Sequence, residues 1–219
     1  VTQILTPKWL AELAVDDDGM LLLEHDDGLQ AIVATRAAGL VAVAKPFTED
    51  GIDVISVIAA PDVGAPDVWA AVDEVVQQLN SGDLWNHETP GEYLTDGHAW
   101  RVADRVRTYV DADAPADGAQ RWLSRLPVWS ADATHDLLDA PGVAEITAPV
   151  AARLPEESDI RCVQAATAKY DENGFSAAAV TAMGFRATGM PHFVDRTVWQ
   201  VEVTFDRPHA VIAIARGGL

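Results

Sequence analysis

Most of this sequence consists of short segments in which apolar and polar residues tend to alternate. Gly, Pro, Asp and Asn separate these segments. A period of two is typical of β-strands, whereas a helix repeats its apolar residues every three or four positions. The segments that predict strands are Met20–Glu24, Leu29–Ala34, Gly39–Lys45, Ile52–Ala60, His98–Val110, Arg125–Ser130, Ile160–Tyr170, Trp199–Phe205 and His209–Ala215. We expect the first two to form a hairpin, and the third and fourth to pair through a polar turn.

Three segments predict helices. Val68–Leu79 repeats Val and Leu at helical spacing, and it follows Asp67, a residue type that caps helix N-termini. The other two are Thr6–Ala14 and Asp132–Ala140, the second of which is followed by Pro and Gly. Because strands outnumber helices and the helices lie between them, the sequence predicts an α+β fold with mixed or mostly antiparallel sheets.

The charge and hydrophobicity of the sequence exclude two classes of binding partner. The 219 residues are 49% hydrophobic, and 34 Asp and Glu residues against 15 Lys and Arg residues give a formal net charge of −19. Such a surface repels phosphate backbones, so we expect no nucleic-acid partner. No segment approaches the roughly 18 apolar residues that a membrane span needs, so we expect no membrane partner. No signal peptide is predicted at the start, although a secreted protein with a trimmed start stays open and the compartment is unassigned.

Residues that carry catalysis or bind metals do not cluster in this sequence. The six His residues are scattered without metal-ligand spacing, and Cys162 is the only cysteine. Ser176 does not lie in a G-x-S-x-G elbow, the turn that exposes the nucleophile of many hydrolases. We therefore expect no catalytic residue, no metal site and no cofactor.

The most informative stretch follows the predicted strand that ends at Tyr170. Three polar residues and Gly174 precede a run of small side chains that begins at Ser176. About thirty residues after that glycine, Phe205-Asp206-Arg207-Pro208 directly precedes an apolar strand. This arrangement resembles the hinge and reactive-centre loop of the serpin family, followed by the serpin motif F-x-x-x-R-P-F before a central strand. The Phe-to-Arg gap is shorter here, and His209 replaces the last Phe.

The resemblance covers residues 39–215 of what we expect to be one serpin-like domain over 1–219, with 1–38 as an N-terminal extension. Gly39–Phe47 and Ile52–Pro61 resemble paired strands of that family, and Arg125–Gly142 resembles a strand followed by a helix. The resemblance thus implies an α+β fold that lacks most of the helical N-terminal half of a serpin. A separate companion chain or a homodimer could supply what is missing, or the chain could be a reduced form that closes its fold by itself.

The resemblance also implies the positions of functional residues. The implied hinge consists of Glu172, Asn173, Gly174, Phe175, Ser176, Ala177, Ala178, Ala179, Val180 and Thr181. The candidates for the reactive bond are Arg186, Ala187, Thr188 and Gly189, and an Arg at the first of these would suit a trypsin-like protease. The implied partner is a protease, or another protein, that contacts residues 184–198.

A loop that inserts into a sheet needs small side chains, because every second one must enter a packed core. Phe175 departs from this pattern at the first position to insert, and overpacking typically costs about 1–3 kcal/mol. The leading hypothesis is therefore a serpin-like protein that inhibits weakly or not at all and acts through its loop. The alternatives are a working inhibitor of serine or cysteine proteases, and a hydrolase on an unrelated α+β fold.

Overall fold

The computed structural model describes residues 8–10, 12–49, 51–82, 84, 89–95, 99–110, 114–136, 163–176 and 193–215. Within these residues the chain consists mainly of strands, together with the α-helix α1 (Ala65–Ser81) and the 3-10 helix η1 (Gly91–Tyr93). The strands are β1 (Ala14–Val15), β2 (Met20–Glu24), β3 (Gly28–Thr35), β4 (Gly39–Pro46), β5 (Ile52–Ile58), β6 (Trp100–Val110), β7 (Gln120–Pro127), β8 (Trp129–Asp136), β9 (Val163–Asp171), β10 (Gly174–Ser176), β11 (Phe193–Thr204) and β12 (Ala210–Ala215).

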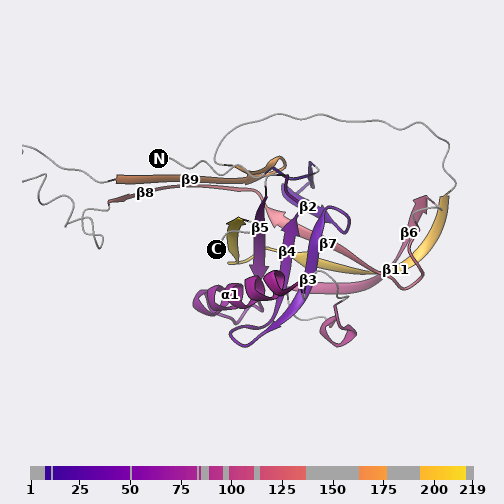
Figure 1. Cartoon of the computed structure of the whole chain (residues 1–219). Helices are drawn as coiled ribbons and strands as arrows, with labels where there is room; N and C mark the ends of the chain where they lie inside the picture. Colours follow the sequence, from indigo (N-terminus) through magenta and orange to yellow (C-terminus); the bar gives the residue numbers. More distant parts are fainter. Residues whose placement is uncertain are drawn as a thin grey trace, which may run out of the picture.

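The described strands form three sheets (Figure 1). One has four strands in the order β12-β5-β4-β3, the second has five in the order β1-β2-β7-β11-β6, and the third has three in the order β10-β9-β8. Neighbouring strands are antiparallel, except for the parallel pair of β7 and β11. The predicted α+β class with mixed, mostly antiparallel sheets is therefore confirmed.

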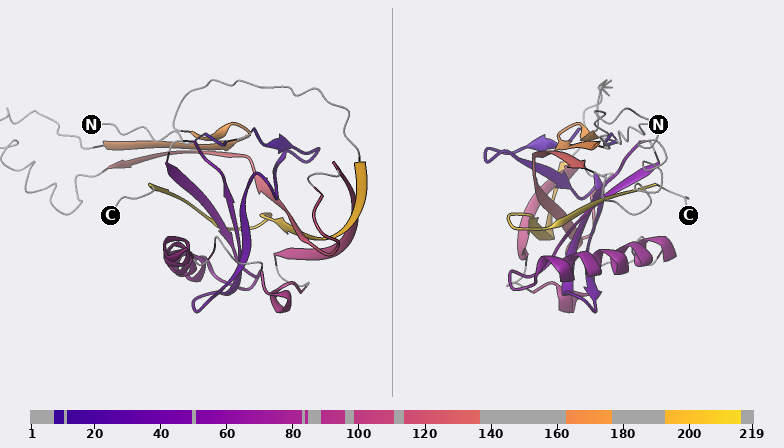
Figure 2. Two further views of the ribbon diagram at one scale, coloured as in Figure 1. Left: turned by 45° about the vertical axis from the view of Figure 1, so that its right-hand side comes forward. Right: turned by 90° about the vertical axis from the view of Figure 1, so that its left-hand side faces the viewer.

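The four-stranded sheet is covered on both faces. Helix α1 packs on one face (Figure 2), in a core that contains Val33, Val41, Val43, Ile55, Val57, Val68, Val72, Val75 and Leu79. The opposite face packs on the five-stranded sheet, in a core that contains Leu21, Leu23, Ile32, Val54, Ile58, Trp100, Trp122, Leu126, Val201, Val203 and Phe205. This position explains why β4 and β5 are almost continuously apolar, because neither side of a doubly covered strand faces water.

Helix α1 was predicted correctly but begins earlier than its apolar pattern indicated. Gly64 is its N-cap residue, and Asp67 lies in the first turn instead of capping the helix. A carboxylate in the first turn still interacts favourably with the positive end of the helix dipole. The helix ends before Gly82, whose φ of 83° is a left-handed conformation that glycine adopts without strain. Among the described residues, no helix is long and apolar enough to cross a membrane.

The predicted hairpin of Met20–Glu24 with Leu29–Ala34 is wrong, although both segments are strands. β2 pairs with β7, whereas β3 pairs with β4 in a different sheet. The burial of the two strands gives the physical reason. β2 alternates between buried and less buried residues, whereas Gln30 to Val33 of β3 are buried without interruption. β3 thus belongs to the doubly covered layer, which β2 could not share.

Two of the predicted helices are also wrong where the structure describes them. Lys8 and Trp9 form isolated β-bridges, and Ala14 begins β1, so Thr6–Ala14 is not helical there. Residues 132–136 continue β8, which pairs with β9 along its whole length; residues 137–140 lie outside the described part. Strand pairing across the fold overrides a weak local helix signal. Of the strand-then-helix pattern expected for 125–142, the described residues 125–136 form the end of one strand, a break at Val128, and another strand.

The segments predicted near the C-terminal end are strands. Trp199 to Thr204 form the end of the longer strand β11, which stops one residue before Phe205, and His209–Ala215 contains β12. The resemblance implied that the second would be a central strand. Among the described strands, β12 is instead the outermost strand of its sheet, next to β5.

Candidate hinge site

The predicted hinge begins with a tight hairpin. β9 ends at Asp171, the chain turns through Glu172 and Asn173, and β10 runs back along β9. Gly174 pairs with Asp171, Phe175 with Tyr170, and Ser176 with Lys169. The residue after the turn must therefore start a new strand at once, and glycine suits this position because its φ of 153° is rare for other residues.

Asp171 organises the turn. Its Oδ1 accepts a hydrogen bond from the Asn173 backbone N–H at 2.9 Å, and its Oδ2 lies 2.5 Å from Lys169 Nζ. Burial by itself raises the pKa of Asp171. The hydrogen bonds from Lys169 and from the Asn173 and Gly174 backbones outweigh that effect and hold the pKa below its ordinary value. The same ion pair raises the pKa of Lys169. The hinge turn thus depends on an ionised carboxylate.

This ion pair predicts a pH dependence that an Asp171→Asn variant can measure. A lowered pKa in the folded state means that the carboxylate stabilises the fold above the unfolded-state value of about 3.9, and that this contribution falls as the pH drops through the folded-state pKa. We expect the wild type to exceed the variant in free energy of unfolding by a constant amount between about pH 6 and 8, and by less below about pH 4. Urea titrations of both proteins, in the neutral range and below about pH 4, measure this difference in free energy of unfolding. A difference that is larger below about pH 4 contradicts the assignment.

A segment far away in sequence, residues 8–13, crosses the hinge turn. Trp9 Nε1 donates a buried hydrogen bond of 2.8 Å to the Asp171 carbonyl, and the Trp9 backbone N–H donates one of 3.3 Å to the Asn173 carbonyl. The Leu13 N–H donates to the Glu172 carbonyl at 3.1 Å. All three carbonyls of the turn therefore have partners in this one segment.

The same segment fastens the hinge to the four-stranded sheet. Trp9 also forms a β-bridge with Thr48, and the Leu10 N–H donates to the Phe47 carbonyl at 2.6 Å. Phe47 and Thr48 lie in the connection between β4 and β5. We call residues 8–13 the clasp, because they join the hinge turn to that connection.

Aromatic side chains fill the space beneath the hinge. Phe175, Tyr170 and Trp129 are neighbours across β10, β9 and β8. The Trp129 ring is stacked on Tyr170 at 6.0 Å and meets Phe175 edge-on at 6.1 Å. Trp9 of the clasp lies 5.1 Å from Tyr170 between ring centroids. Such contacts are worth about 0.5–1.5 kcal/mol each beyond the area that they bury.

Tyr170 is the centre of this cluster and is 1% exposed. Burial raises the pKa of its phenol, and the neighbouring Ser56 hydroxyl of β5 opposes that rise. Neither hydroxyl makes a hydrogen bond of normal geometry within the described part of the chain. The ring therefore stabilises the fold through packing, and its hydroxyl contributes little.

The predicted hinge is only partly within the described residues. Glu172 to Ser176 form the turn and β10, while 177–181 lie outside, as do the reactive-bond candidates at 186–189. Of the predicted contact segment 184–198, residues 193–198 are part of β11 and pair with β6, and 184–192 lie outside the described part.

Sequence reasoning missed the clasp and Trp129 as parts of the hinge. Trp9 and Asp171 are 162 positions apart, and no local pattern links them. The only available signal was the tryptophan itself, because a large aromatic residue near the start of a chain usually packs on something.

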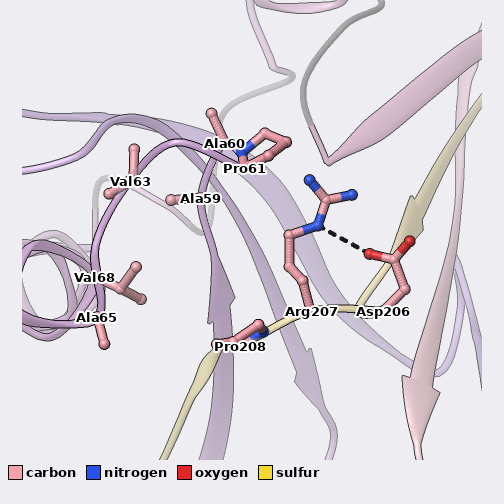
Figure 3. A pocket seen from close by; sticks show the side chains of 9 residues that line it. All are labelled: Ala59, Ala60, Pro61, Val63, Ala65, Val68, Asp206, Arg207 and Pro208. Carbon is pink, nitrogen blue, oxygen red and sulfur yellow. Dashed lines mark hydrogen bonds and ion pairs between the residues drawn. The ribbon is translucent and has the colours of Figure 1, made fainter.

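The Phe205-Asp206-Arg207-Pro208 motif carries the chain from β11 into β12. Phe205 is buried, and its N–H donates to the Arg125 carbonyl at 2.9 Å. Next to the motif is a pocket of about 370 Å³, lined by Ala59, Ala60, Pro61, Val63, Ala65, Val68, Asp206, Arg207 and Pro208 (Figure 3). Its charged lining residues bind each other, with Arg207 Nε 2.9 Å from Asp206 Oδ1. We therefore assign this pocket no ligand.

Two serpin structures are similar to this chain. Serpin48 of the insect Tenebrio molitor, described as a highly specific serpin, is 13% identical with a TM-score of 0.46; the match covers 96% of this chain and 50% of that one. A serpin from the trematode Schistosoma haematobium is 14% identical with a TM-score of 0.44; the match covers 97% of this chain and 47% of that one. No family model and no curated protein sequence matches. The chain spans about half the length of these serpins, the family that its sequence pattern resembles.

Proposed function

We propose that this chain is a serpin-like protein of weak or absent inhibitory activity that acts without catalysis, by presenting the segment after its hinge to another protein. The observation that carries this proposal is the position of β10. It is the outermost strand of its sheet among the described strands and pairs with β9; Gly174 also forms a β-bridge with Lys8 of the clasp, and no other strand of the described part pairs with Phe175 and Ser176.

The register of β10 supports a path for the residues that follow it. Continuing the pairing beyond Ser176 and Lys169 sets 177 opposite 168 and 182 opposite 163. Residues 165–168 are Ala-Ala-Thr-Ala and 177–179 are all Ala, so bulk does not oppose this pairing. Within the described part of the chain, no strand other than β10 lies on this edge of β9, so a released loop has a sheet edge on which to lie.

The energy of that pairing is too small to trap a protease. Six more residues on one neighbour add about six hydrogen bonds at roughly 1 kcal/mol each, or about 6 kcal/mol. Ordering six residues costs about 1–2 kcal/mol each, or about 6–12 kcal/mol. Insertion between two strands would double the free energy gained from hydrogen bonds and leave the cost of ordering the six residues unchanged. Addition to a single strand thus gains little or nothing, which favours a substrate or a recognition loop over a trap.

Phe175 has a different role from the one that we expected. It is not waiting to insert, since it is already paired with Tyr170 in β10 and packed on Trp129. It holds the start of the loop in place. In this proposal the anchored hinge presents the following residues at a fixed point on the surface.

A working inhibitor is the second candidate function. The observation that favours it is the hairpin itself, because a strand that has already begun on β9 shortens the distance that a cut loop must travel. Arg186 would then direct a trypsin-like protease to the loop. This candidate requires a further strand beside β10, from a companion chain or a second copy.

Incubation with trypsin-, subtilisin- and papain-like proteases distinguishes the two candidates. We expect cleavage within residues 177–192, identified by mass spectrometry, and no SDS-stable complex with any protease. A control with each protease inactivated beforehand identifies non-covalent carry-over. A covalent complex that survives SDS would establish the inhibitor and overturn our proposal. Turnover of a small ester by the purified chain would overturn both and favour a hydrolase.

A further inference from the structure

One face of the five-stranded sheet carries several arginines on a protein whose net charge is −19; Arg101 and Arg105 are exposed there, and Arg107, Arg121 and Arg196 are half-buried. Alternate residues of a strand share a face, and so do residues that pair across strands. The register therefore places on one face Arg101, Arg105, Arg107, Arg121 and Arg196, together with Arg125, which is bound by Asp16 and Asp18. We call the first five of these residues the arginine face.

Contacts between side chains agree with this placement. Arg107 Nη2 donates to Gln200 Oε1 at 2.9 Å, and the Arg121 guanidinium lies 5.4 Å from the centre of the Tyr109 ring. Gln200 pairs with Ala103, so both contacts lie on the face that Arg101 and Arg105 share. The opposite face carries Val102, which pairs with the core residue Val201.

Two arginines of this face are directly opposite each other. Arg107 of β6 pairs with Arg196 of β11, and like charges in this position destabilise a sheet. Carboxylates accompany three of the five: Arg107 approaches Glu24 at 3.9 Å, Arg121 binds Asp26 at 3.1 Å, and Arg101 pairs with Glu202 of β11. Arg105 and Arg196 have no carboxylate within ion-pair distance in the described part of the chain.

Within the described part of the chain, one edge of β6 is free. β6 is the outermost strand of its sheet there (Figure 1). Its residues 103–106 are exposed. Arg105 and Arg107 are two residues apart on it, which is roughly 6.8 Å along an antiparallel strand. An extended peptide paired to this edge would present its own alternate side chains at the same spacing and on the same face.

We infer that the arginine face and the free edge of β6 form a docking surface for a short, extended acidic segment of a protein, with carboxylates at alternate positions. The arginines favour a partner with carboxylates, and pairing with the edge of β6 favours a partner with an extended backbone. The acidic surface of the rest of the molecule limits the length of the bound segment. Screening limits each surface charge to about 8–10 Å, and a long polyanion would reach the acidic surroundings and be repelled. This inference does not depend on the loop or on its insertion.

Fluorescence anisotropy tests the surface with a labelled peptide that alternates Glu and Thr and has 11 residues, the length of β6. We expect binding that weakens with salt, and at least tenfold weaker binding of the corresponding Gln-Thr peptide. The double variant Arg105→Glu with Arg196→Glu should lose at least about tenfold in affinity. Arg36→Glu, an exposed arginine on the turn between β3 and β4, should bind like the wild type.

Three further outcomes make the test decisive. N-methylation of alternate peptide amides should abolish binding, and retained binding would overturn the edge pairing.

Arg196→Glu alone should keep or raise the thermal midpoint, because it replaces a like-charge pair with an opposite one. The expected result is therefore weaker peptide binding with an unchanged fold. Equal loss in the Arg36→Glu variant, or tighter binding of a sulfated oligosaccharide than of the Glu-Thr peptide, would overturn the acidic-segment assignment.

Discussion

Replacing Tyr170 with alanine is expected to destabilise the fold by about 3–5 kcal/mol. The side chain is almost completely buried and contacts Trp9 and Trp129, so its removal leaves a cavity between two sheets. Urea unfolding followed by tryptophan fluorescence measures the change, because both neighbours are tryptophans. A loss below about 1 kcal/mol would show that the cluster does not hold the hinge.

The matched control at this position is Tyr170→Phe. It keeps the ring and removes a buried hydroxyl that makes no hydrogen bond of normal geometry in the described part of the chain. Removal of an unsatisfied buried polar group is neutral or stabilising. We therefore expect the phenylalanine variant to unfold within about 1 kcal/mol of the wild type. A loss as large as that of the alanine variant would assign the stability to the hydroxyl instead of the ring.

Replacing Trp9 with alanine is the second change with a large expected effect, again about 3–5 kcal/mol. It removes the contact with Tyr170 and the hydrogen bond to the Asp171 carbonyl, which then lacks its buried donor. Because the clasp also crosses the hinge turn, we expect proteolysis of residues 177–192 to become faster than global unfolding alone explains. Limited proteolysis and urea unfolding of the same sample separate the two effects.

Trp69 provides the control for the Trp9 variant. It lies on α1, is 52% exposed, and is far in sequence from the hinge. Surface substitutions of this kind usually change stability by less than about 0.5 kcal/mol. If Trp69→Ala and Trp9→Ala increase loop proteolysis equally, the clasp has no specific role at the hinge.

The sequence predicted those elements whose type follows from a single pattern of apolar residues. The continuous apolar runs of β4 and β5 and the helical spacing of α1 each reflect a single local environment, and each was predicted correctly. Pairing was less predictable. β2 and β3 are adjacent in sequence and each is plainly strand-like, yet they lie in different sheets. Two strands that are adjacent in sequence form a hairpin only if they can be buried in the same sheet. β3 is buried on both faces and β2 is not.

The hinge shows the same limit. Gly174 and the polar residues before it indicated a turn at the end of a long strand, and the structure contains one. The contacts that fix this turn come from Trp9, Leu13 and Trp129, which are distant in sequence. Phe175 seemed an obstacle because its size is visible in the sequence, whereas the aromatic neighbour that accommodates it is not. Local patterns indicated the element, and only tertiary contacts define its role.

The thermal midpoint of the loop-cleaved protein tests the central claim most directly. The chain is cut within 177–192 by a trypsin- or subtilisin-like protease, the protease is inactivated, and cleaved and intact samples are melted side by side. Pairing on one side of β9 alone predicts midpoints within about 3 °C of each other, since a shift of 1 kcal/mol corresponds to about 2–4 °C for a chain of this size. A rise of about 10 °C or more after cleavage would mean that the loop enters a sheet between two strands, and would contradict the account.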